Sequence, residues 1–292
     1  MVKLNLFDIQ GFVARGYNFP RASYLLAEIP DYKAGREFVG RVTEQVTSAE
    51  RWEQGKPPST LNIGFTWKGL RKLGLPDATL LSFPDELYQG MRARNRILGD
   101  VGKNDPANWD SVWKEEIHVW LGVSAQTPDD LARRCDEMGR LMQETGGARL
   151  LYAQQASAIY ISGQPTPNEH FGYTDGFGNP DYEGVERNTI PGQGKLMPDG
   201  KWAPLATGEF ILGYPDEGAS CRPARSPTSS GSMARIWRTG SCMRMWRASG
   251  SISTKRASSI LAARRSWPPS SLEDGRTARR WNCRRIARTR IW

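Results

Sequence analysis

The sequence predicts an α+β fold in which helices pack against one face of a β-sheet. Strand-like and helix-like segments alternate through the first 165 residues, as in a layered domain. Ile117–Ala125 has the strongest strand pattern, a nearly continuous apolar run. Thr127–Gly147 follows as the clearest helix, with recognisable signals at both ends. These segments together favour an α+β sandwich with a single helical face.

Five segments have the composition of strands. In one of them, Thr60, Asn62 and Gly64 alternate with apolar residues, which indicates a strand with one buried face. The last closes a long loop with a short apolar run. The expected strands are Ala22–Ile29, Ser59–Thr66, Ile117–Ala125, Ala148–Ile161 and Gly208–Pro215.

The expected helices are marked mainly by their ends. Thr127 is the expected N-cap of the clearest helix, Pro128 occupies its first turn, and Gly146 with Gly147 ends it. Gly74 ends a shorter helix in the same way. The expected helices are Ala34–Val46, Trp67–Gly74, one or two within Pro76–Leu98, and Thr127–Gly147.

The composition excludes several classes of protein. No run of eighteen apolar residues exists, so no membrane-spanning helix is expected. The first residues lack an apolar stretch preceded by basic residues, so a secretory signal is not expected. Four cysteines without paired spacing indicate neither a disulfide framework nor a zinc site, and no metal ligand is predicted. The expected location is the cytoplasm.

The net charge of +9 hides a change of sign along the chain. Residues 1–218 hold 23 Lys and Arg against 29 Asp and Glu, a balance of −6. Residues 219–292 hold 17 Lys and Arg against two acids, a balance of +15. Such an asymmetry indicates that the two parts differ in origin or in role.

The segment Glu169–Pro180, EHFGYTDGFGNP, lies in a Gly- and Pro-rich stretch from Asn168 to about Pro215. Long loops in compact domains are usually functional or disordered. The central acid, Asp175, stands between Gly172 and Gly176, and glycines allow unusual backbone conformations and close approach by a ligand. Local signals alone favour an ordinary turn, since Asp-Gly and Asn-Pro are common turn dipeptides.

Five sequence blocks occur in a fixed order: Asp8–Tyr17, Pro57–Pro76, Ser82–Asp100, Glu169–Pro180 and Gly208–Glu217. Together they resemble the dye-decolourising peroxidases, a family of haem enzymes, over residues 8–218. The resemblance implies a ferredoxin-like antiparallel sheet with helices, of the dimeric α+β barrel superfamily. It also implies that the second half of the fold is incomplete in this chain.

The resemblance implies a peroxidase that reduces hydrogen peroxide and oxidises dyes or other bulky organic reductants. In the family the GxxDG segment lies over the distal face of the haem, which makes Asp175 the expected catalytic acid–base group. A positioned carboxylate contributes ~10²–10⁴-fold to such a proton transfer. The aromatic rings of the segment are expected to wall the pocket and desolvate the carboxylate. The residues expected to contact haem b are Phe171, Gly172, Tyr173, Thr174, Gly176, Phe177 and Gly178.

A haem peroxidase also needs a fifth iron ligand, normally a histidine. The chain has two histidines. His118 lies within an expected strand and is interpreted as a core or edge residue. His170 lies on the segment that should face the opposite side of the iron. Neither matches the family's ligand position, and the family's distal arginine, which also lies downstream, has no counterpart here.

Residues 219–292 are interpreted as the product of a shifted reading frame. They contain sixteen Arg, fourteen Ser and five of the eleven Trp, and apolar periodicity stops. When the last base of each codon is read with the first two of the next, Lys255–Trp281 can encode AGKQYPGGKEELAAKFVGRWPDGTPL, which resembles the continuation of the family. Met233–Gly250, read in the same shifted frame, can also encode a sequence that resembles the continuation of the family. A shift near Ala219 predicts a tail without a packed core, poor haem binding and little peroxidase activity.

These observations predict three parts: a ferredoxin-like domain over 1–165, a linker over 166–218 with the distal loop and the start of a second domain, and the aberrant tail over 219–292. Two rival functions stay open. One is a non-catalytic α+β domain whose basic tail binds nucleic acid non-specifically, and the other is a haem carrier without catalysis. The sequence also leaves open whether the chain forms a homo-oligomer. Core packing is favoured over electron relay for five aromatic residues, Trp67, Trp109, Trp113, Trp120 and Tyr152.

Overall fold

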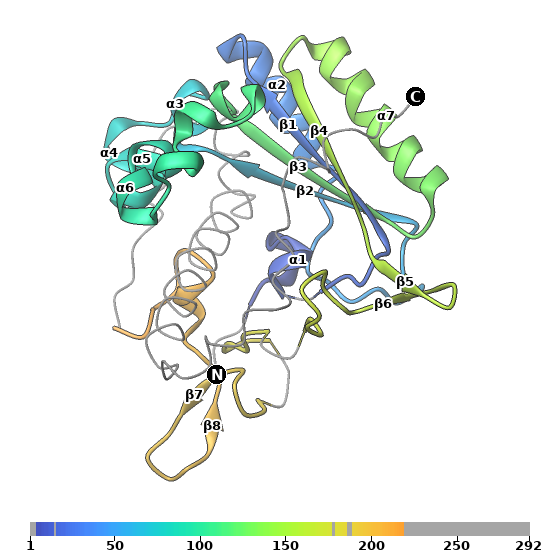
Figure 1. Ribbon diagram of the computed structural model, residues 1–292, viewed down its shortest axis with the longest axis vertical. Helices are drawn as coiled ribbons and strands as arrows, with labels where there is room; N and C mark the ends of the chain where they lie inside the picture. Colours follow the sequence, from blue (N-terminus) through green and yellow to red (C-terminus); the bar gives the residue numbers. More distant parts are fainter. Residues whose placement is uncertain (1–3, 15, 177–178, 186–188, 219–292) are drawn as a thin grey trace. The chain divides into compact units, whose positions relative to one another are not determined.

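The computed structural model describes residues 4–14, 16–176, 179–185 and 189–218 (Figure 1). A four-stranded sheet in this part has the order β2-β3-β1-β4, and all neighbouring strands are antiparallel. The βαββαβ sequence of elements and this order are those of a ferredoxin-like fold. The expected α+β class and the first four expected strands are therefore confirmed. The strands are β1 (Arg21–Glu28), β2 (Ser59–Phe65), β3 (Val119–Ala125) and β4 (Arg149–Ser157).

Helices α2 (Tyr32–Thr43) and α7 (Pro128–Thr145) cover one face of this sheet (Figure 1). Helix α7 begins at the predicted cap, because the Thr127 side-chain oxygen accepts a hydrogen bond of 3.1 Å from the Asp130 N–H. It ends at Gly146, which has φ +60°. The helix therefore has both ends where its sequence signals place them.

Helix α2 begins two residues earlier than the apolar pattern predicts. The Asp31 side chain accepts hydrogen bonds of 2.9 Å from the N–H groups of Lys33 and Ala34. These bonds satisfy backbone donors that a helix start leaves without partners, so the cap rather than the apolar pattern sets the boundary.

The main core lies between the sheet and these two helices. Phe38 and Val42 of α2, Leu121 and Val123 of β3, and Met138 of α7 are fully buried there. Burial of apolar side chains stabilises the fold by roughly 25 cal/mol per Å² removed from water. The buried residues of this core all lie within the first 150 residues of the chain.

The opposite face of the sheet is only partly covered, by the segment that contains α1 (Gly11–Ala14). Gln10 lies against the edge of β2: its Nε2 donates to the Ile63 carbonyl oxygen and its Oε1 accepts from the Ile63 N–H, both at 3.0 Å. On the β1 side of this face, Tyr24 stacks on Trp120 with ring centroids 5.7 Å apart. Tyr24 and Tyr152 remain exposed.

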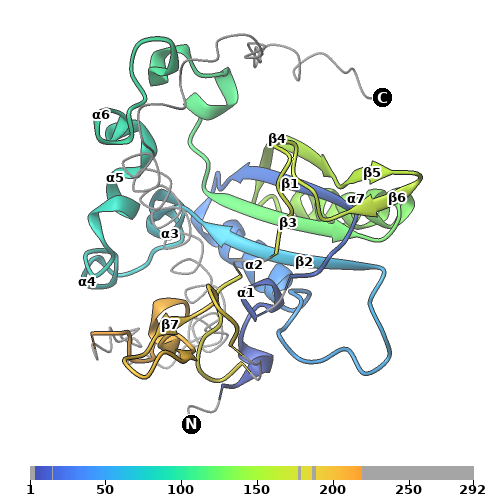
Figure 2. The same ribbon diagram turned by 60° about the horizontal axis from the view of Figure 1, so that its bottom comes forward.

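A helical segment follows β2 and lies beside one end of the sheet (Figure 2). Pro76–Leu98 forms three short helices rather than the expected one or two, and Gly90, with φ +66°, kinks the backbone within α5. Gly74, with φ +75°, follows the first helix, as expected. The segment comprises α3 (Trp67–Lys72), α4 (Asp77–Leu80), α5 (Asp85–Ala93) and α6 (Asn95–Leu98), followed by 3₁₀ helices at Gly102–Asn104, Pro106–Asn108 and Ser111–Lys114.

Beyond β4 the chain forms short hairpins and loops. The expected strand Ala148–Ile161 divides into β4 and β5, and the long expected loop contains the two-residue strands β7 and β8. No helix of the described ranges is long and apolar enough to cross a membrane. The short strands are β5 (Ile159–Ile161), β6 (Gln164–Thr166), β7 (Lys195–Leu196) and β8 (Trp202–Ala203).

The expected strand Gly208–Pro215 is wrong. Thr207–Glu209 is a 3₁₀ helix, and the Ile211 N–H donates to the Thr207 carbonyl oxygen at 2.9 Å. A strand needs a neighbour to pair with, and none of the described residues pairs with this segment as a strand. Phe210 and Ile211 instead bury in a second, smaller apolar cluster, which also contains Leu4, Ile9, Ala14, Ala49 and Tyr182.

Candidate functional site

The segment that the sequence singles out, from Asn168 to Asp175, is a tight hairpin. Asn168 and Thr174 form an antiparallel bridge, and the Thr174 hydroxyl contacts the Asn168 side-chain oxygen at 3.2 Å. The Glu169 N–H donates to the Tyr173 carbonyl oxygen at 2.7 Å, and the Gly172 N–H donates to the Glu169 carbonyl oxygen at 3.0 Å. The hairpin is thus held by its own backbone.

Asp175 lies at the end of this hairpin. Its N–H donates to the Pro167 carbonyl oxygen at 2.8 Å, which ties its backbone to the residue that follows β6. Gly172 has φ +87° and Gly176 has φ +97°, conformations that side-chain-bearing residues rarely adopt. The Asp175 residue is exposed. A rigid turn therefore presents a carboxylate at the surface of this part of the chain.

The aromatic rings of the hairpin do not wall a pocket among the described residues. Phe171 is 85% exposed and Tyr173 is 69% exposed. Such rings gain most of their stabilisation from burial, and this part of the chain offers them no surface. Thr174 lies within the hairpin with the two glycines, whereas Phe177 and Gly178 fall outside the described residues.

His118 is a core residue, as the sequence indicates. It is 6% exposed, and its Nδ1 accepts a hydrogen bond of 2.9 Å from the Ile29 N–H. This bond places its proton on Nε2, which lies 3.6 Å from a Glu116 carboxylate oxygen. Burial lowers the pKa of His118, while Glu116 opposes the shift. The neutral ring is therefore part of the fold and is separate from the Asp175 hairpin.

The described residues do not form a complete haem site. His170 is exposed and lies on the same hairpin as Asp175, so it does not supply a ligand from the opposite side of a macrocycle. No group of three or more His, Cys, Asp and Glu side chains in the described ranges could hold a metal ion. The family's positions for the iron ligand and the distal arginine lie downstream of residue 218, outside the part that the structure describes.

The sequence reading missed the residues that anchor the segment after the hairpin. Asp181 is buried; its N–H donates to the Gln193 carbonyl oxygen at 2.6 Å, and its side chain accepts a hydrogen bond from Thr189. The Tyr182 hydroxyl donates to the Val13 carbonyl oxygen at 2.7 Å. The only signal in the sequence is an aromatic residue within PDYEG, a segment that reads as a loop.

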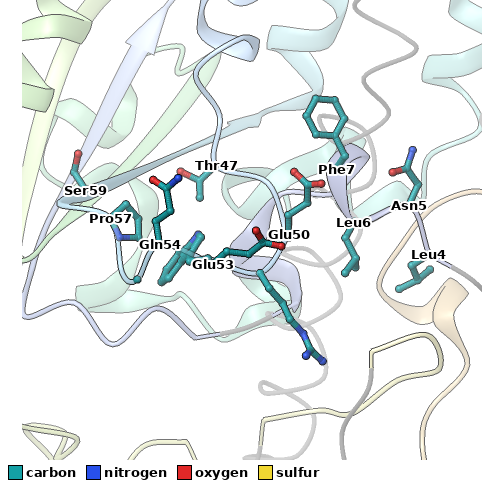
Figure 3. Close-up of a pocket in the computed structure, with 13 residues that line it drawn as sticks. Leu4, Asn5, Leu6, Phe7, Thr47, Glu50, Glu53, Gln54, Pro57 and Ser59 are labelled. Atoms are coloured by element: carbon teal, nitrogen blue, oxygen red, sulfur yellow. The ribbon is translucent and has the colours of Figure 1, made fainter.

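No described residue of the hairpin lines a broad, open cavity of about 1080 Å³ (Figure 3). The residues of 4–7 line one part of it, and residues within 47–59 line the rest. None of these described lining residues is a predicted site residue. Its carboxylates, Glu50 and Glu53, and its openness to solvent do not match a pocket for a flat apolar macrocycle.

The model of the DyP dimeric alpha+beta barrel domain matches residues 8–150. Over these residues, just under half of the chain, the sequence matches the domain of the dye-decolourising peroxidases. The match includes β1, β2 and β3, the two covering helices, the segment from α3 to α6 and the first two residues of β4. The resemblance seen in the sequence and the fold that it implied are both confirmed.

Similar proteins agree with this assignment. The chain is 25% identical over 224 residues to Peroxidase 2 of Mycetinis scorodonius. It also matches the structure of an ancestral D-type dye decolorizing peroxidase with a TM-score of 0.63 and 25% identity. A decolorizing peroxidase from Auricularia auricula-judae, at 19% identity and a TM-score of 0.62, shares the fold.

The chain spans less than half of most of these relatives. The match to Peroxidase 2 covers 75% of this chain and 40% of that protein. The match to the ancestral enzyme covers 77% of this chain and 47% of the other, and that to the Auricularia enzyme covers 81% and 54%. Much of the relatives' length therefore has no matched counterpart in this chain.

Proposed function

We propose that this chain carries the first part of a haem peroxidase, in which Asp175 is the acid–base group at the distal face of haem b. The family match over residues 8–150 carries the proposal, and the rigid hairpin that presents Asp175 supports it. The substrates would be hydrogen peroxide and a bulky organic reductant such as a dye, in the cytoplasm. In this account residues 1–165 are the first domain and 166–218 lead into the second.

The hairpin has the chemistry that peroxide reduction requires of a protein. A bound haem would supply the two electrons that break the O–O bond. Asp175 would take the proton from one peroxide oxygen and return it to the other, so that water can leave. Gly172 has nothing within 4 Å of the position of a Cβ atom, so the backbone here can approach a flat macrocycle. Phe171 and Tyr173 offer exposed rings for a macrocycle to cover.

We also propose that the 292-residue form is impaired. A shifted frame from about Ala219 onward would remove the second half of the fold, and with it the iron ligand and the distal arginine. Weak haem binding and little dye oxidation are then expected. Sequencing the encoding DNA tests this cause: an intact in-frame gene through codon 230, with no shift relative to its relatives, would rule it out.

The role of Asp175 is tested in the frame-restored protein. Asp175→Asn should lower peroxidase kcat by ~10²–10⁴-fold, because the amide cannot accept the proton, while the Soret band of bound haem is retained. Asp199→Asn is the matched control, because Asp199 is an exposed acid in the β7–β8 turn. Equal activity of Asp175→Asn and the control would refute the acid–base role.

A second candidate function is non-specific nucleic-acid binding, which the charge of +15 over residues 219–292 favours. The full chain should then bind DNA with an affinity that falls steeply as salt rises. A chain ending at residue 218, with a balance of −6, should not bind. Equal binding by both forms would exclude the tail as the cause.

A further inference from the structure

A second cleft, unrelated to the Asp175 hairpin, lies where helices α3 and α5 meet the end of the sheet. Its volume is about 850 Å³. Trp67 and Tyr88 form one wall, with ring centroids 4.9 Å apart in an edge-to-face arrangement. The Trp67 Nε1–H donates to the Leu80 carbonyl oxygen at 3.2 Å, which fixes the indole. Tyr88 is 59% exposed, so an aromatic face is open to a ligand.

Tyr32 contributes a second aromatic side chain to the cleft. Its hydroxyl accepts a hydrogen bond of 2.6 Å from Arg36. A Cβ atom at Gly74 would lie 2.3 Å from the Tyr32 ring, so the ring packs directly on the glycine backbone. Tyr32 is held in place and is still 40% exposed. The cleft therefore offers two positioned rings that solvent can reach.

The cleft also holds excess positive charge. Lys68 pairs with Glu116, and Asp31 is engaged in capping α2. Arg71 and Lys72 also line the cleft, and among the described residues neither makes an ion pair. The Arg71 guanidinium lies 5.8 Å from the centre of the Trp67 ring. Two cations thus remain available to a ligand beside the aromatic wall.

A buried donor completes the polar side of the cleft. His118 lines it and is more than nine-tenths buried. Because its Nδ1 accepts from the Ile29 N–H, its Nε2 carries the proton and lies 3.6 Å from a Glu116 carboxylate oxygen. Gly69 keeps this arrangement close-packed, because a Cβ atom there would lie 2.1 Å from the His118 carbonyl oxygen.

We propose that this cleft binds a small planar aromatic anion, an aryl carboxylate or aryl sulfonate. The rings of Tyr88 and Tyr32 would contact the aromatic face, and Arg71 and Lys72 would pair with the anionic group. Guanidinium and ammonium groups recognise such oxyanions well, and exposed aromatic faces favour planar ligands. The site requires no haem, so this proposal does not depend on the proposed peroxidase function.

The test uses the full chain labelled with 5-fluorotryptophan and titrated with 2-naphthalenesulfonate. The fluorine signal of Trp67, assigned by its loss in Trp67→Phe, should shift and saturate. The uncharged 2-naphthalenemethanol should bind about tenfold more weakly, because it has no anionic group to pair with the two cations. An unmoved Trp67 signal, or equal affinity for the two probes, would overturn the proposal.

A matched pair of variants separates this site from general attraction to a basic protein. Arg71→Gln with Lys72→Gln should weaken 2-naphthalenesulfonate binding at Trp67 by about tenfold. Lys103→Gln with Lys201→Gln removes the same charge from exposed positions outside the cleft and should change the affinity less than about twofold. If both double variants bind equally well, the cations of the cleft are not the recognition element and the proposal fails.

Discussion

The sheet domain and the Asp175 hairpin differ in how far their aromatic side chains are buried. Phe38 of α2 is completely buried between the helices and the sheet, whereas Phe171 of the hairpin is 85% exposed. The buried residues of the main core of the sheet domain all lie within residues 25–148, and the partly buried residues packed against them lie within 12–153. The hairpin is ordered by its own backbone bonds and leaves its rings uncovered. The first region is complete as an apolar core, and the second has the form of a surface that another part must cover.

The segment Gly208–Pro215 also shows how the structure depends on a partner elsewhere in the fold. Its apolar residues are typical of a strand, yet Phe210 and Ile211 follow a 3₁₀ helix at Thr207–Glu209 and pack against the N-terminal residues. Local preference for a strand needs a neighbouring edge to become a strand. The described part of the chain does not supply that edge, which agrees with the proposal that the second half of the fold is lost.

The largest expected effect on stability compares the two phenylalanines. Phe38→Ala should lower the free energy of unfolding by about 3–5 kcal/mol, because it opens a cavity in a closed core. Phe171→Ala should change it by less than about 0.5 kcal/mol. Urea denaturation followed by circular dichroism measures both. A large loss for Phe171→Ala would show that the hairpin is packed in solution and would break the comparison.

The next effect concerns the edge of β2. Gln10→Leu should cost about 2 kcal/mol, because the N–H and the carbonyl group of Ile63 lose their side-chain partners in a buried place. Gln143→Leu is the control, since Gln143 lies exposed on α7. The same denaturation measurement applies. Similar stability of the two variants would mean that Gln10 does not close this edge.

A smaller effect should come from the anchor of the linker. Tyr182→Phe removes the hydroxyl that donates to the Val13 carbonyl oxygen and should cost about 1 kcal/mol. Tyr173→Phe, on the exposed hairpin, should cost almost nothing. Hydrogen exchange around Val13 should quicken only in Tyr182→Phe. Unchanged exchange there would contradict the anchoring role.

The smallest effect is a dependence of stability on pH through His118. Burial lowers its pKa below the ordinary value of 6.5. Between the two pKa values the unfolded chain binds a proton that the folded chain does not, so protonation favours unfolding. This contribution is fully present above about pH 6.5 and is lost as pH falls through the lowered folded pKa. His118→Gln should flatten the decline in this window, and exposed His170→Gln should not. Equal slopes would refute the assignment.

The sequence predicts the sheet domain well and the later segment poorly, for a physical reason. Thr127, Pro128 and Gly146 act through neighbours a few residues away, so the ends of α7 can be read from local signals. The position of Asp175 on a glycine-bearing turn can be recognised in the same way. The anchors Gln10 and Tyr182, and the cleft around His118, depend on contacts between residues far apart in the chain. No local pattern marks them.

Haem titration of the 292-residue chain beside its frame-restored counterpart tests the central claim most directly. Soret absorbance and dye oxidation are measured at equal protein concentrations. The restored protein should bind haem stoichiometrically and oxidise dye in the presence of peroxide, while the 292-residue chain should show a weak Soret band and little turnover. A strong, stoichiometric Soret band with robust dye oxidation by the 292-residue chain itself would contradict the claim.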